Sequence, residues 1–427
     1  MTFQLNAEQV TTLDNLSAFE DIYVLKGYAG TGKTTVITRW IEAIRKKPGD
    51  WPKGKFWHAP SVVLTAPTNK ATNVLKEMAK EIKLPVDVST IHSLLSLKMK
   101  WEKAAQVLVK DTRGDDTFKD YDYVVIDEAS MLDTDMMNKY ILPAHEATGN
   151  KLIFMGDPCQ LPPIGEKESE SFDSSEDISE LTQVMRQADD NPIQGLALYL
   201  RELILGRTSQ YPIRIFEFVD DENIFHIPVA NFEDQILEAF ANDERASDIR
   251  HVAWTNRVVN SWNDKIRDKV YGFDREEWTE GERIVTTSPV IDQGEGGVVF
   301  STDTLLKIQR EPIQEDWKGI PCWKLWVKNK IIHVPVRGTD QLFNTIKDEL
   351  LVAAKQDRKQ WYKFYRFMEA FVHVKPAFSL TVHRSQGSTF DDVYVSYQNI
   401  LTNPNRIESL QCLYVAITRP RGRLFLV

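Results

Sequence analysis

One stretch near the N-terminus restricts the fold more than any other: residues 27–34 read GYAGTGKT. An apolar run over residues 22–25 comes before it and predicts a strand, and residues 35–44 have the spacing of a helix. A glycine-rich turn between a strand and a helix points backbone N–H groups inward and, with the helix N-terminus, attracts phosphate oxygens. The stretch therefore predicts an α/β fold that binds a nucleoside triphosphate at the end of this strand.

The residue types inside this phosphate loop predict separate roles. The glycines allow the backbone to curl, Lys33 can reach the β- and γ-phosphates, and the Thr34 hydroxyl can complete a Mg²⁺ shell. The alternative, a glycine-rich turn that happens to precede a lysine, explains neither the full pattern nor its flanks. The predicted nucleotide-binding residues of the loop are Gly27, Gly30, Thr31, Gly32, Lys33, Thr34 and Thr35.

Length and composition indicate a globular protein of several domains. The chain has 427 residues, 42% of them hydrophobic and 27% charged, which predicts two to four domains. Its apolar runs are only a few residues long, and the N-terminus lacks a signal pattern, so we expect a cytosolic protein without a membrane span. Single, scattered cysteines at 159, 322 and 412 suggest neither a disulfide framework nor a metal cluster.

The formal net charge of −10 argues against non-specific coating of duplex nucleic acid. Net charge is a weak guide to a local site, however, because a narrow basic channel can lie on an acidic protein. A dedicated nucleic-acid groove therefore stays open as an expectation.

A second polar motif follows the strand predicted over residues 121–126, where Asp127 and Glu128 stand at the carboxyl end. Ligands of open α/β sheets bind at that end. Asp127 is placed to hold Mg²⁺, and Glu128 to orient or deprotonate the attacking water. Two acidic residues after a strand are common by chance, but the upstream phosphate loop favours the functional interpretation.

A third motif, GDPCQLPP at 156–163, follows the strand predicted over residues 151–155. The amide of Gln160 could sense the γ-phosphate or the water, unless the glycine and prolines only shape a turn. Residues 165–177, rich in Glu, Ser and Asp, predict a flexible acidic loop. Before the first strand, Gln9 could bond an adenine edge or be an exposed helix residue.

The remaining first half contains two predicted strand ends and a hairpin. Residues 62–64 predict a strand, after which Thr68 can cap a helix, and residues 89–95 begin another helix. Residues 99–118 alternate polar and apolar side chains and predict a projecting hairpin, with Leu108 near its centre and Trp101 as a competing strand-separating residue.

The second half mixes α/β patterns with short strands. Residues 193–205 predict a helix, and residues 251–254 a strand that leads to Thr255 and another helix. Short strands broken by Gly and Pro over residues 282–336 predict a small barrel, followed by a helical stretch over residues 340–370. Basic and aromatic residues at 358–367 could stack bases, but helical spacing favours packing against the barrel.

The order of the motifs resembles that of superfamily 1 helicases over residues 9–419. The compact length, the hairpin and the form of the VHRSQGS segment at 382–388 resemble those of the 5′-to-3′ branch. This branch contains RecD and the Dda-like helicases of T-even-type phages. The seven segments are GYAGTGKT (27–34), TAPT (65–68), VIDEAS (125–130), GDPCQLPP (156–163), LTQVMRQ (181–187), VHRSQGS (382–388) and LYVAITR (413–419).

This resemblance implies an α/β fold with two RecA-like parallel-sheet motor domains. A small hairpin insertion is expected in the first domain, and an SH3-like β-barrel with a helical extension in the second. The implied boundaries are residues 1–96 and 121–178 for the first domain, 97–120 for the hairpin, 179–280 and 376–427 for the second domain, and 281–375 for the barrel.

The resemblance also assigns site residues. Gln9 reads adenine, Gly387 contacts the nucleotide, Asp127 binds the metal with Thr34, and Glu128 is the base. The implied catalytic set is Lys33, Asp127, Glu128, Gln160 and two arginine fingers, Arg186 and Arg419. The implied nucleic-acid contacts are Pro67, Thr68, Asn69, Thr90, His92, Leu108, Thr255, Asn256, Thr381, His383 and Ser385.

Two residues depart from the pattern of the family. Pro420 follows Arg419 where small residues are usual, and should end the helix early. Arg384 stands where lysine is frequent, and its forked geometry differs from that of an ammonium group.

The expected activity is ATP- and Mg²⁺-dependent unwinding of DNA, with 5′-to-3′ movement on single strands, in phage-type replication, recombination or repair. Expected partners are single-stranded DNA, forked or partial duplex DNA and a single-strand-binding protein, with no membrane partner. We expect a monomer in the cytoplasm, of a bacterial host if phage-encoded. Two alternatives stay open: an RNA helicase of the same superfamily, and an ATP-driven translocase that displaces proteins without opening duplex.

Overall fold

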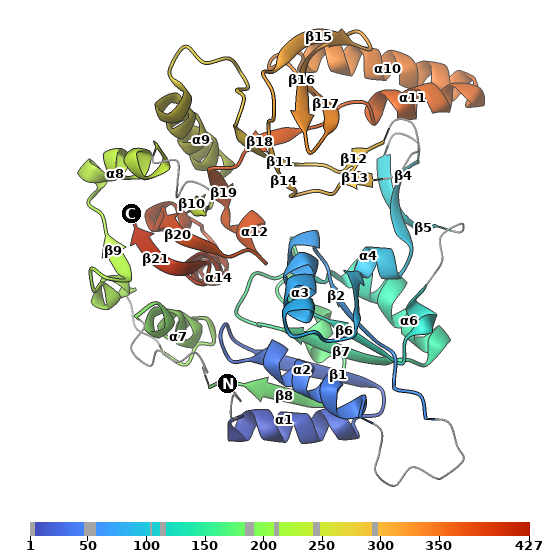
Figure 1. Cartoon of the computed structure of the whole chain (residues 1–427), viewed down its shortest axis with the longest axis vertical. Coiled ribbons are helices and arrows are strands. Elements are labelled where there is room, and N and C mark those ends of the chain that lie inside the picture. Colours follow the sequence, from blue (N-terminus) through green and yellow to red (C-terminus); the bar gives the residue numbers. More distant parts are fainter. Residues whose placement is uncertain are drawn as a thin grey trace. The chain divides into compact units, whose positions relative to one another are not determined.

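The computed structural model describes residues 5–46, 57–102, 105–111, 117–183, 192–208, 213–241, 248–292 and 298–427 (Figure 1). The chain forms two compact units. Unit 1 consists of Met1–Lys100, Leu108–Phe218 and Pro404–Thr418; unit 2 consists of Trp101–Val107, Val219–Asn403 and Arg419–Val427.

Unit 1 is built on a six-stranded sheet in the order β3-β2-β6-β7-β1-β8, and every ladder in it is parallel. The middle strands are short and apolar and are buried on both faces, as expected for a parallel sheet covered by helices. The strands are β1 (Ile22–Gly27), β2 (Val62–Ala66), β3 (Asp87–Thr90), β6 (Tyr123–Ile126), β7 (Lys151–Gly156) and β8 (Ile178–Leu181).

Helices cover both faces of this sheet and enclose two hydrophobic cores. One core takes residues from α1 (Ala7–Ala18), α2 (Lys33–Ile44) and α3 (Asn69–Glu81). The other takes residues from α4 (Ile91–Leu94), α5 (Thr134–Met136) and the π-helical turn η3 (Met137–Ile141), which continues into α6 (Leu142–Thr148). Two further helices of unit 1, α7 (Pro192–Ile204) and α14 (Arg406–Ile417), contact each other.

The predicted hairpin is present as a two-stranded sheet of β4 (Leu97–Glu102) and β5 (Ala105–Lys110). A 3₁₀ turn, η1 (Thr117–Asp120), leads from it to β6. The side chain of Trp101 lies outside the described residues. The compact units differ from the implied domain boundaries at three places. Trp101–Val107 belongs to unit 2, whereas residues 179–218 and Pro404–Thr418, which includes α14, belong to unit 1.

Unit 2 contains a five-stranded parallel sheet in the order β19-β10-β20-β21-β9. Helices α8 (Val229–Ala241) and α9 (Asn256–Tyr271) contribute Phe232, Ile236 and Ile266 to its core. Its strands and short helices are β9 (Ile224–His226), β10 (Ile249–Ala253), β19 (Ser379–Thr381), β20 (Phe390–Val395), β21 (Pro420–Leu426), α12 (Val382–Ser385) and α13 (Tyr397–Leu401).

The insertion in unit 2 has three small antiparallel sheets, in the orders β14-β11-β18, β12-β13 and β15-β16-β17. They share one core, so the prediction of short strands is confirmed, but their ladders stay in separate sheets and the SH3-like barrel stays a prediction. The strands are β11 (Arg283–Thr286), β12 (Val290–Ile291), β13 (Val298–Phe300), β14 (Leu305–Lys307), β15 (Ile313–Trp317), β16 (Ile320–Val327), β17 (Lys330–Pro335) and β18 (Val374–Pro376).

The helical stretch after these strands is interrupted. Asp357, in an extended conformation, ends α10 (Asp340–Gln356) and caps the turn η6 (Arg358–Gln360), which leads into α11 (Trp361–Met368). Phe364 of α11 is buried, and Phe367 packs in a core with Ile320 and Cys322 of β16. Packing is therefore the confirmed role of these two aromatic residues.

The prediction of a flexible acidic loop over residues 165–177 was wrong for its middle. Residues 170–173 form the turn η4 (Glu170–Asp173), in which Ser171 and Phe172 are buried. The Ser171 hydroxyl donates to the carbonyl of Ala129 over 3.0 Å. Composition missed this contact because one apolar ring and one satisfied hydroxyl anchor an otherwise polar segment.

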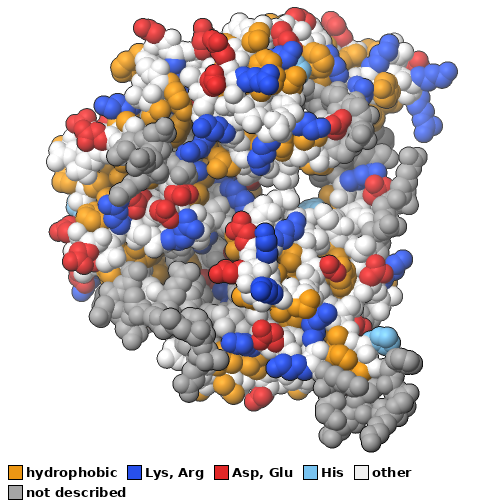
Figure 2. All heavy atoms as spheres, in the orientation of Figure 1, with side chains coloured by type: hydrophobic (Ala, Val, Ile, Leu, Met, Phe, Trp, Pro, Cys, Tyr) orange, Lys and Arg blue, Asp and Glu red, His pale blue; other side chains and the backbone are white. Residues whose placement is uncertain are grey.

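Within the described part of the chain, no helix combines the length and the apolar character that crossing a membrane requires. On the face drawn in Figure 2, Lys and Arg side chains lie among Asp and Glu side chains.

Candidate nucleotide and nucleic-acid sites

The phosphate loop has the predicted position, between β1 and α2. Gly30 and Gly32 take left-handed backbone angles, with φ of 81° and 84°. A Cβ atom on Gly32 would also lie only 2.6 Å from Nε2 of Gln9, so this position needs glycine for two reasons. The loop closes on itself because the Thr31 hydroxyl donates to the Tyr28 carbonyl over 2.9 Å.

Lys33 and Asp127 supply the charges beside the loop. Nζ of Lys33 donates to the carbonyl of Gly27 over 2.6 Å, a weak partner that a phosphate oxygen can replace. Burial raises the pKa of Asp127 although the charge of Lys33 opposes the shift. These groups fit a triphosphate with Mg²⁺. The Lys33 ammonium suits the phosphates, and the hydroxyl of the half-buried Thr34 and the Asp127 carboxylate suit the metal ion.

Glu128 has an unusual backbone for a residue with a side chain. Its φ of 54° lies in the left-handed region, and its N–H donates to Oδ1 of Asp127 over 2.8 Å. Left-handed angles at non-glycine residues cluster at active sites. The conformation is consistent with the predicted role of Glu128 beside the nucleotide.

Gln9 is buried, so the interpretation as an exposed helix residue is wrong. It closes the N-terminus of α1 in a capping box with Asn6, and its Nε2 donates to the carbonyl of Thr31 over 3.0 Å. The side chain therefore supports the phosphate loop from the helix. Reading of adenine by Gln9 stays a prediction.

Gln160 lies in a closed turn after β7. Its N–H donates to the carbonyl of Asp157 over 3.1 Å, and its Oε1 is buried without a hydrogen-bond partner among the described residues. A buried acceptor without a donor is costly, and a ligand can satisfy it. An unpartnered Oε1 is expected if Gln160 binds a water molecule or a phosphate of the nucleotide.

The two predicted arginine fingers have different outcomes. Arg186 lies outside the described residues. Arg419 is buried in unit 2, and its Nη1 donates to the carbonyl of Ser388 over 3.2 Å. The neighbouring Gly387 has a left-handed φ of 66°. As predicted, α14 ends early, at Ile417, and β21 begins at Pro420.

Sequence reasoning missed three residues around this loop. Tyr414 of α14 bonds both Ala29 and Asp157, and Arg201 of α7 lies 3.9 Å above the ring of Tyr28. Tyr414 and Asp157 stood inside recognised motifs, but the motifs directed attention to Arg419 and Gln160. Arg201 had no motif, and only its burial in the fold identifies it.

Except for Leu108 on β5, the predicted nucleic-acid residues of unit 1 lie at the carboxyl ends of two neighbouring strands. After β2, the hydroxyl of Thr68 caps α3 by accepting from the N–H of Ala71 over 3.2 Å. After β3, Thr90 caps α4 by accepting from Ser93 over 3.1 Å. Pro67, half-buried, and Asn69, exposed, flank the first cap, and partial burial lowers the pKa of His92 beside the second.

Unit 2 repeats this arrangement. Thr255 caps α9 after β10, and Thr381 caps α12 after β19. The registers match as well, because Ala66 pairs with Thr90 in unit 1 and Ala253 pairs with Thr381 in unit 2. Each unit therefore has two capped strand ends side by side. Asn256 is exposed after the first cap of unit 2, where it accepts from Nζ of Lys375 over 3.3 Å.

Two predicted contacts, Ser385 and Leu108, are fully and partly buried, respectively. Ser385 is fully buried, and its hydroxyl donates to the carbonyl of Val382 over 2.7 Å. Leu108 is partly buried against a core of unit 1, and its carbonyl accepts from the Tyr140 hydroxyl over 2.8 Å. Ser385 closes its own helical turn, so its side chain is not open to a strand. Leu108 packs in part against the core, and its contact with nucleic acid stays a prediction.

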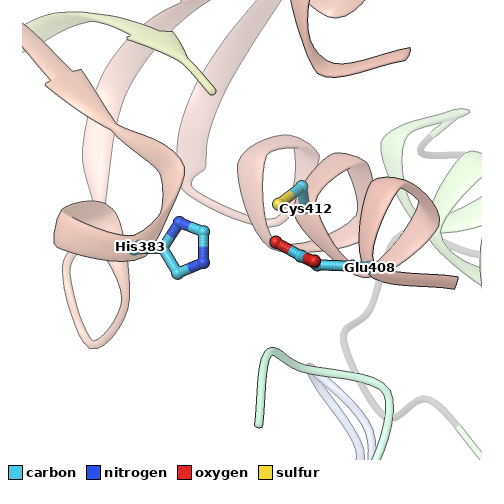
Figure 3. Close-up of side chains that lie close together, drawn as sticks. All are labelled: His383, Glu408 and Cys412. Carbon is cyan, nitrogen blue, oxygen red and sulfur yellow. The ribbon is translucent and has the colours of Figure 1, made fainter. Parts of the chain in front are cut away.

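His383 lies on α12 of unit 2, and Glu408 and Cys412 lie one turn apart on α14 of unit 1 (Figure 3). All three cysteines of the chain are free and buried. Burial, and then the charge of Glu408, raise the pKa of Cys412 to about 12. The thiol is therefore protonated near neutral pH and unreactive.

Comparison with known proteins adds sequence relatives and a shared fold. Residues 4–214 match an AAA domain family, and residues 376–427 match the UvrD-like helicase C-terminal domain. The RecBCD enzyme subunit RecD of Buchnera aphidicola subsp. Acyrthosiphon pisum is 32% identical, over 99% of this chain and 71% of that protein. Uncharacterized protein R530 of Acanthamoeba polyphaga mimivirus is 24% identical, over 98% of this chain and 99% of that protein.

Among solved structures, Bacteroides Pif1 bound to ssDNA has a TM-score of 0.51 at 16% identity, over 99% of this chain and 92% of that chain. The parallel sheets, the phosphate loop after β1 and the carboxylate of Asp127 after β6, which β7 separates from β1, define a P-loop nucleotide hydrolase. Given the RecD relative at 32% identity, the chain belongs to the RecD family of helicases and is an ATP-dependent DNA helicase.

Proposed function

We propose that this chain moves 5′ to 3′ on single-stranded DNA and unwinds forked or partial duplex DNA. The observation that carries the proposal is the pair of threonine-capped strand ends that recurs in both units, with matching register. Two equivalent sets of hydroxyl and amide groups allow one strand to be held by each unit in turn. The relative Bacteroides Pif1 was solved bound to ssDNA, which supports the choice of polymer.

In this proposal Lys33 and the glycine-rich loop bind the phosphates, with Gln9 near the base. Thr34 and Asp127 hold Mg²⁺, which neutralises charge on the phosphates when it is bound. Glu128 orients the attacking water and accepts its proton, and Gln160 offers Oε1 to the same water. Each role follows from the side-chain chemistry described above.

In this proposal Arg186 and Arg419 serve as arginine fingers, and Gly387 contacts the nucleotide. A finger of this kind accelerates hydrolysis by roughly 10³–10⁵. Because a finger acts only when it reaches the γ-phosphate, it couples hydrolysis to domain movement.

We further propose the domain plan that the motifs imply: RecA-like domains at residues 1–96 with 121–178 and at 179–280 with 376–427, a strand-separating hairpin at 97–120 and an SH3-like barrel at 281–375. The chain acts as a monomer of the Dda-like type, in phage DNA replication, recombination or repair in the cytoplasm of a bacterial host. A single-strand-binding protein is its proposed partner on the displaced strand.

The first test is ATP hydrolysis without polymer, with single-stranded DNA and with RNA, at two salt concentrations. We expect strong stimulation by DNA that decreases with salt, because phosphate contacts release counterions. Lys33→Ala is the control, and its hydrolysis should be lost. Stronger stimulation by RNA would identify an RNA helicase, and equal rates in all three would contradict the proposal.

Polarity is tested with two partial duplexes that carry opposite overhangs. We expect unwinding of the duplex with the 5′ overhang and little of the other. Unwinding only from the 3′ overhang would refute the polarity. Hydrolysis and removal of a protein block from the strand, without strand separation, would identify the translocase alternative.

A further inference from the structure

Tyr414 is a buried phenol of α14 that lies against the phosphate loop. Its hydroxyl contacts Oδ2 of Asp157 over 2.7 Å and the backbone nitrogen of Ala29 over 3.3 Å. Tyr414 is 1% exposed and Asp157 is 0% exposed, so water does not compete for either group. One phenol oxygen therefore joins three elements: α14, the phosphate loop and the loop after β7.

The direction of these hydrogen bonds is fixed by the groups themselves. A backbone N–H can only donate, so the phenol oxygen accepts from Ala29 and gives its own proton to Asp157. Burial, and then the Asp157 carboxylate, hold the pKa of Tyr414 well above its usual range. The phenol is therefore protonated near neutral pH, and the bond to Asp157 is charge-assisted.

Asp157 also holds the backbone that carries Gln160. Its Oδ1 accepts from the N–H of Cys159 over 2.9 Å, and its carbonyl accepts from the N–H of Gln160 over 3.1 Å. Gln411, on α14, donates Nε2 to the carbonyl of Gln160 over 3.1 Å. Thus α14 fixes the Gln160 loop from two side chains, whereas Oε1 of Gln160 has no partner among the described residues.

The other end of α14 explains why this link matters. Five residues after Tyr414 the chain reaches Arg419, and the boundary between the two compact units falls between Thr418 and Arg419. A displacement of the phosphate loop would therefore act on a helix that leads directly to the point where the chain enters unit 2.

We propose that Tyr414 is a positioning residue for ATP hydrolysis, which sets the spacing between the phosphate loop and the Gln160 loop and passes changes in that spacing along α14. The hydroxyl does not react. It holds Ala29 and Asp157 at the distances described, and so keeps Oε1 of Gln160 where the reaction needs it. This role concerns ATP hydrolysis, and it is independent of the 5′-to-3′ direction of movement proposed above.

The test is Tyr414→Phe, which keeps the ring and removes only the hydroxyl. We expect kcat for DNA-stimulated hydrolysis to fall about tenfold, the effect of one charge-assisted hydrogen bond, with KM for ATP within about twofold of the wild type. The matched control is Tyr23→Phe. Tyr23 is also a buried phenol of unit 1, and its hydroxyl contacts Ser179 over 2.5 Å, away from the phosphate loop. The control should lower the melting temperature and leave kcat unchanged.

A double-mutant cycle separates positioning from general loss of stability. Asp157→Asn should lower kcat by a similar factor. The double variant Tyr414→Phe, Asp157→Asn should have a kcat no lower than the worse single variant, because both substitutions remove the same hydrogen bond. Losses that multiply, or a wild-type kcat in Tyr414→Phe, would overturn the proposal. If Tyr414→Phe does not fold, Gln411→Leu tests the second contact of α14 with the Gln160 loop, and an unchanged kcat there would equally overturn it.

Discussion

His251 lies on β10 of unit 2, between the hydroxyl of Ser379 on β19 and the hydroxyl of Ser396, which directly follows β20. Its Nδ1 is 2.7 Å from Oγ of Ser379, and its Nε2 is 2.9 Å from Oγ of Ser396. Burial lowers the pKa of His251 to about 3. The ring is therefore neutral in the folded protein at any moderate pH, with both nitrogens in hydrogen bonds.

This lowered pKa predicts a loss of stability in acid. Below its ordinary pKa of about 6.5, the unfolded chain binds a proton at His251 that the folded chain does not bind until about pH 3. The free energy of unfolding should thus decrease by about 1.4 kcal/mol for each pH unit between these values. Urea unfolding of His251→Gln at pH 5 to 8 should show a shallower pH dependence than the wild type.

The control for this measurement is His226→Gln, because His226 is exposed on β9. Comparison of the two variants separates the loss of a buried histidine from the loss of an exposed one. Burial also lowers the pKa of His92, His333 and His373, so His251→Gln should reduce the slope without abolishing it. An unchanged slope would show that His251 does not titrate as described.

Among the elements, the junction between α9 and the insertion depends on a buried ion pair. Arg267 of α9 and Glu282, just before β11, are both fully buried, with Nε and Oε1 2.5 Å apart. The Arg267 guanidinium also lies 5.2 Å above the ring of Trp278. The pair therefore fixes the point at which the chain leaves the second parallel sheet for the small antiparallel sheets.

Replacing one member of this ion pair should lower the free energy of unfolding strongly, whereas replacing both members by apolar residues should not. Glu282→Gln leaves a buried guanidinium without its counter-charge, and we expect a loss of about 3–5 kcal/mol in the free energy of unfolding. The double variant Arg267→Met, Glu282→Leu should be closer to the wild type. The matched control is Glu233→Gln on α8, which breaks an exposed ion pair with Lys265 of α9, the helix that also carries Arg267. This variant should cost less than about 1 kcal/mol in the free energy of unfolding. Equal losses in Glu282→Gln and Glu233→Gln would contradict this account.

The elements that the sequence predicted well are those with a strong local pattern. β1, β6 and β7 are short apolar runs that end in polar motifs, and the phosphate loop needs glycine at positions 30 and 32. What could not be predicted depends on distant partners. The burial of Gln9 against Thr31, the contact of Tyr414 with Asp157 and the membership of α14 in unit 1 leave no periodic trace in the chain.

Position in a motif was also insufficient to predict exposure. Ser385 stands in a recognised segment, yet its hydroxyl satisfies a carbonyl of its own turn. Leu108 has the central place in the hairpin pattern, but its side chain is partly buried against a core. In both cases the burial of a polar or apolar group was decided by neighbours that the local sequence does not specify.

On the scale of the whole molecule, each unit has its own hydrophobic cores. We therefore expect thermal unfolding in two calorimetric transitions rather than one. A non-hydrolysable ATP analogue should raise the midpoint of the transition that belongs to unit 1, because a ligand stabilises only the part that binds it. A single transition with equal calorimetric and van't Hoff enthalpies would contradict this expectation.

The segment that completes unit 1 comes late in synthesis. The phosphate loop is made early, but α14 follows some 380 residues later, which takes roughly 20–80 s at the usual rate of translation. During this time the nascent nucleotide site has no Tyr414, and the surface that residues 409–417 will cover is open. The order of the chain thus means that the ribosome makes α14, the last support of the nucleotide site, long after it has made the phosphate loop itself.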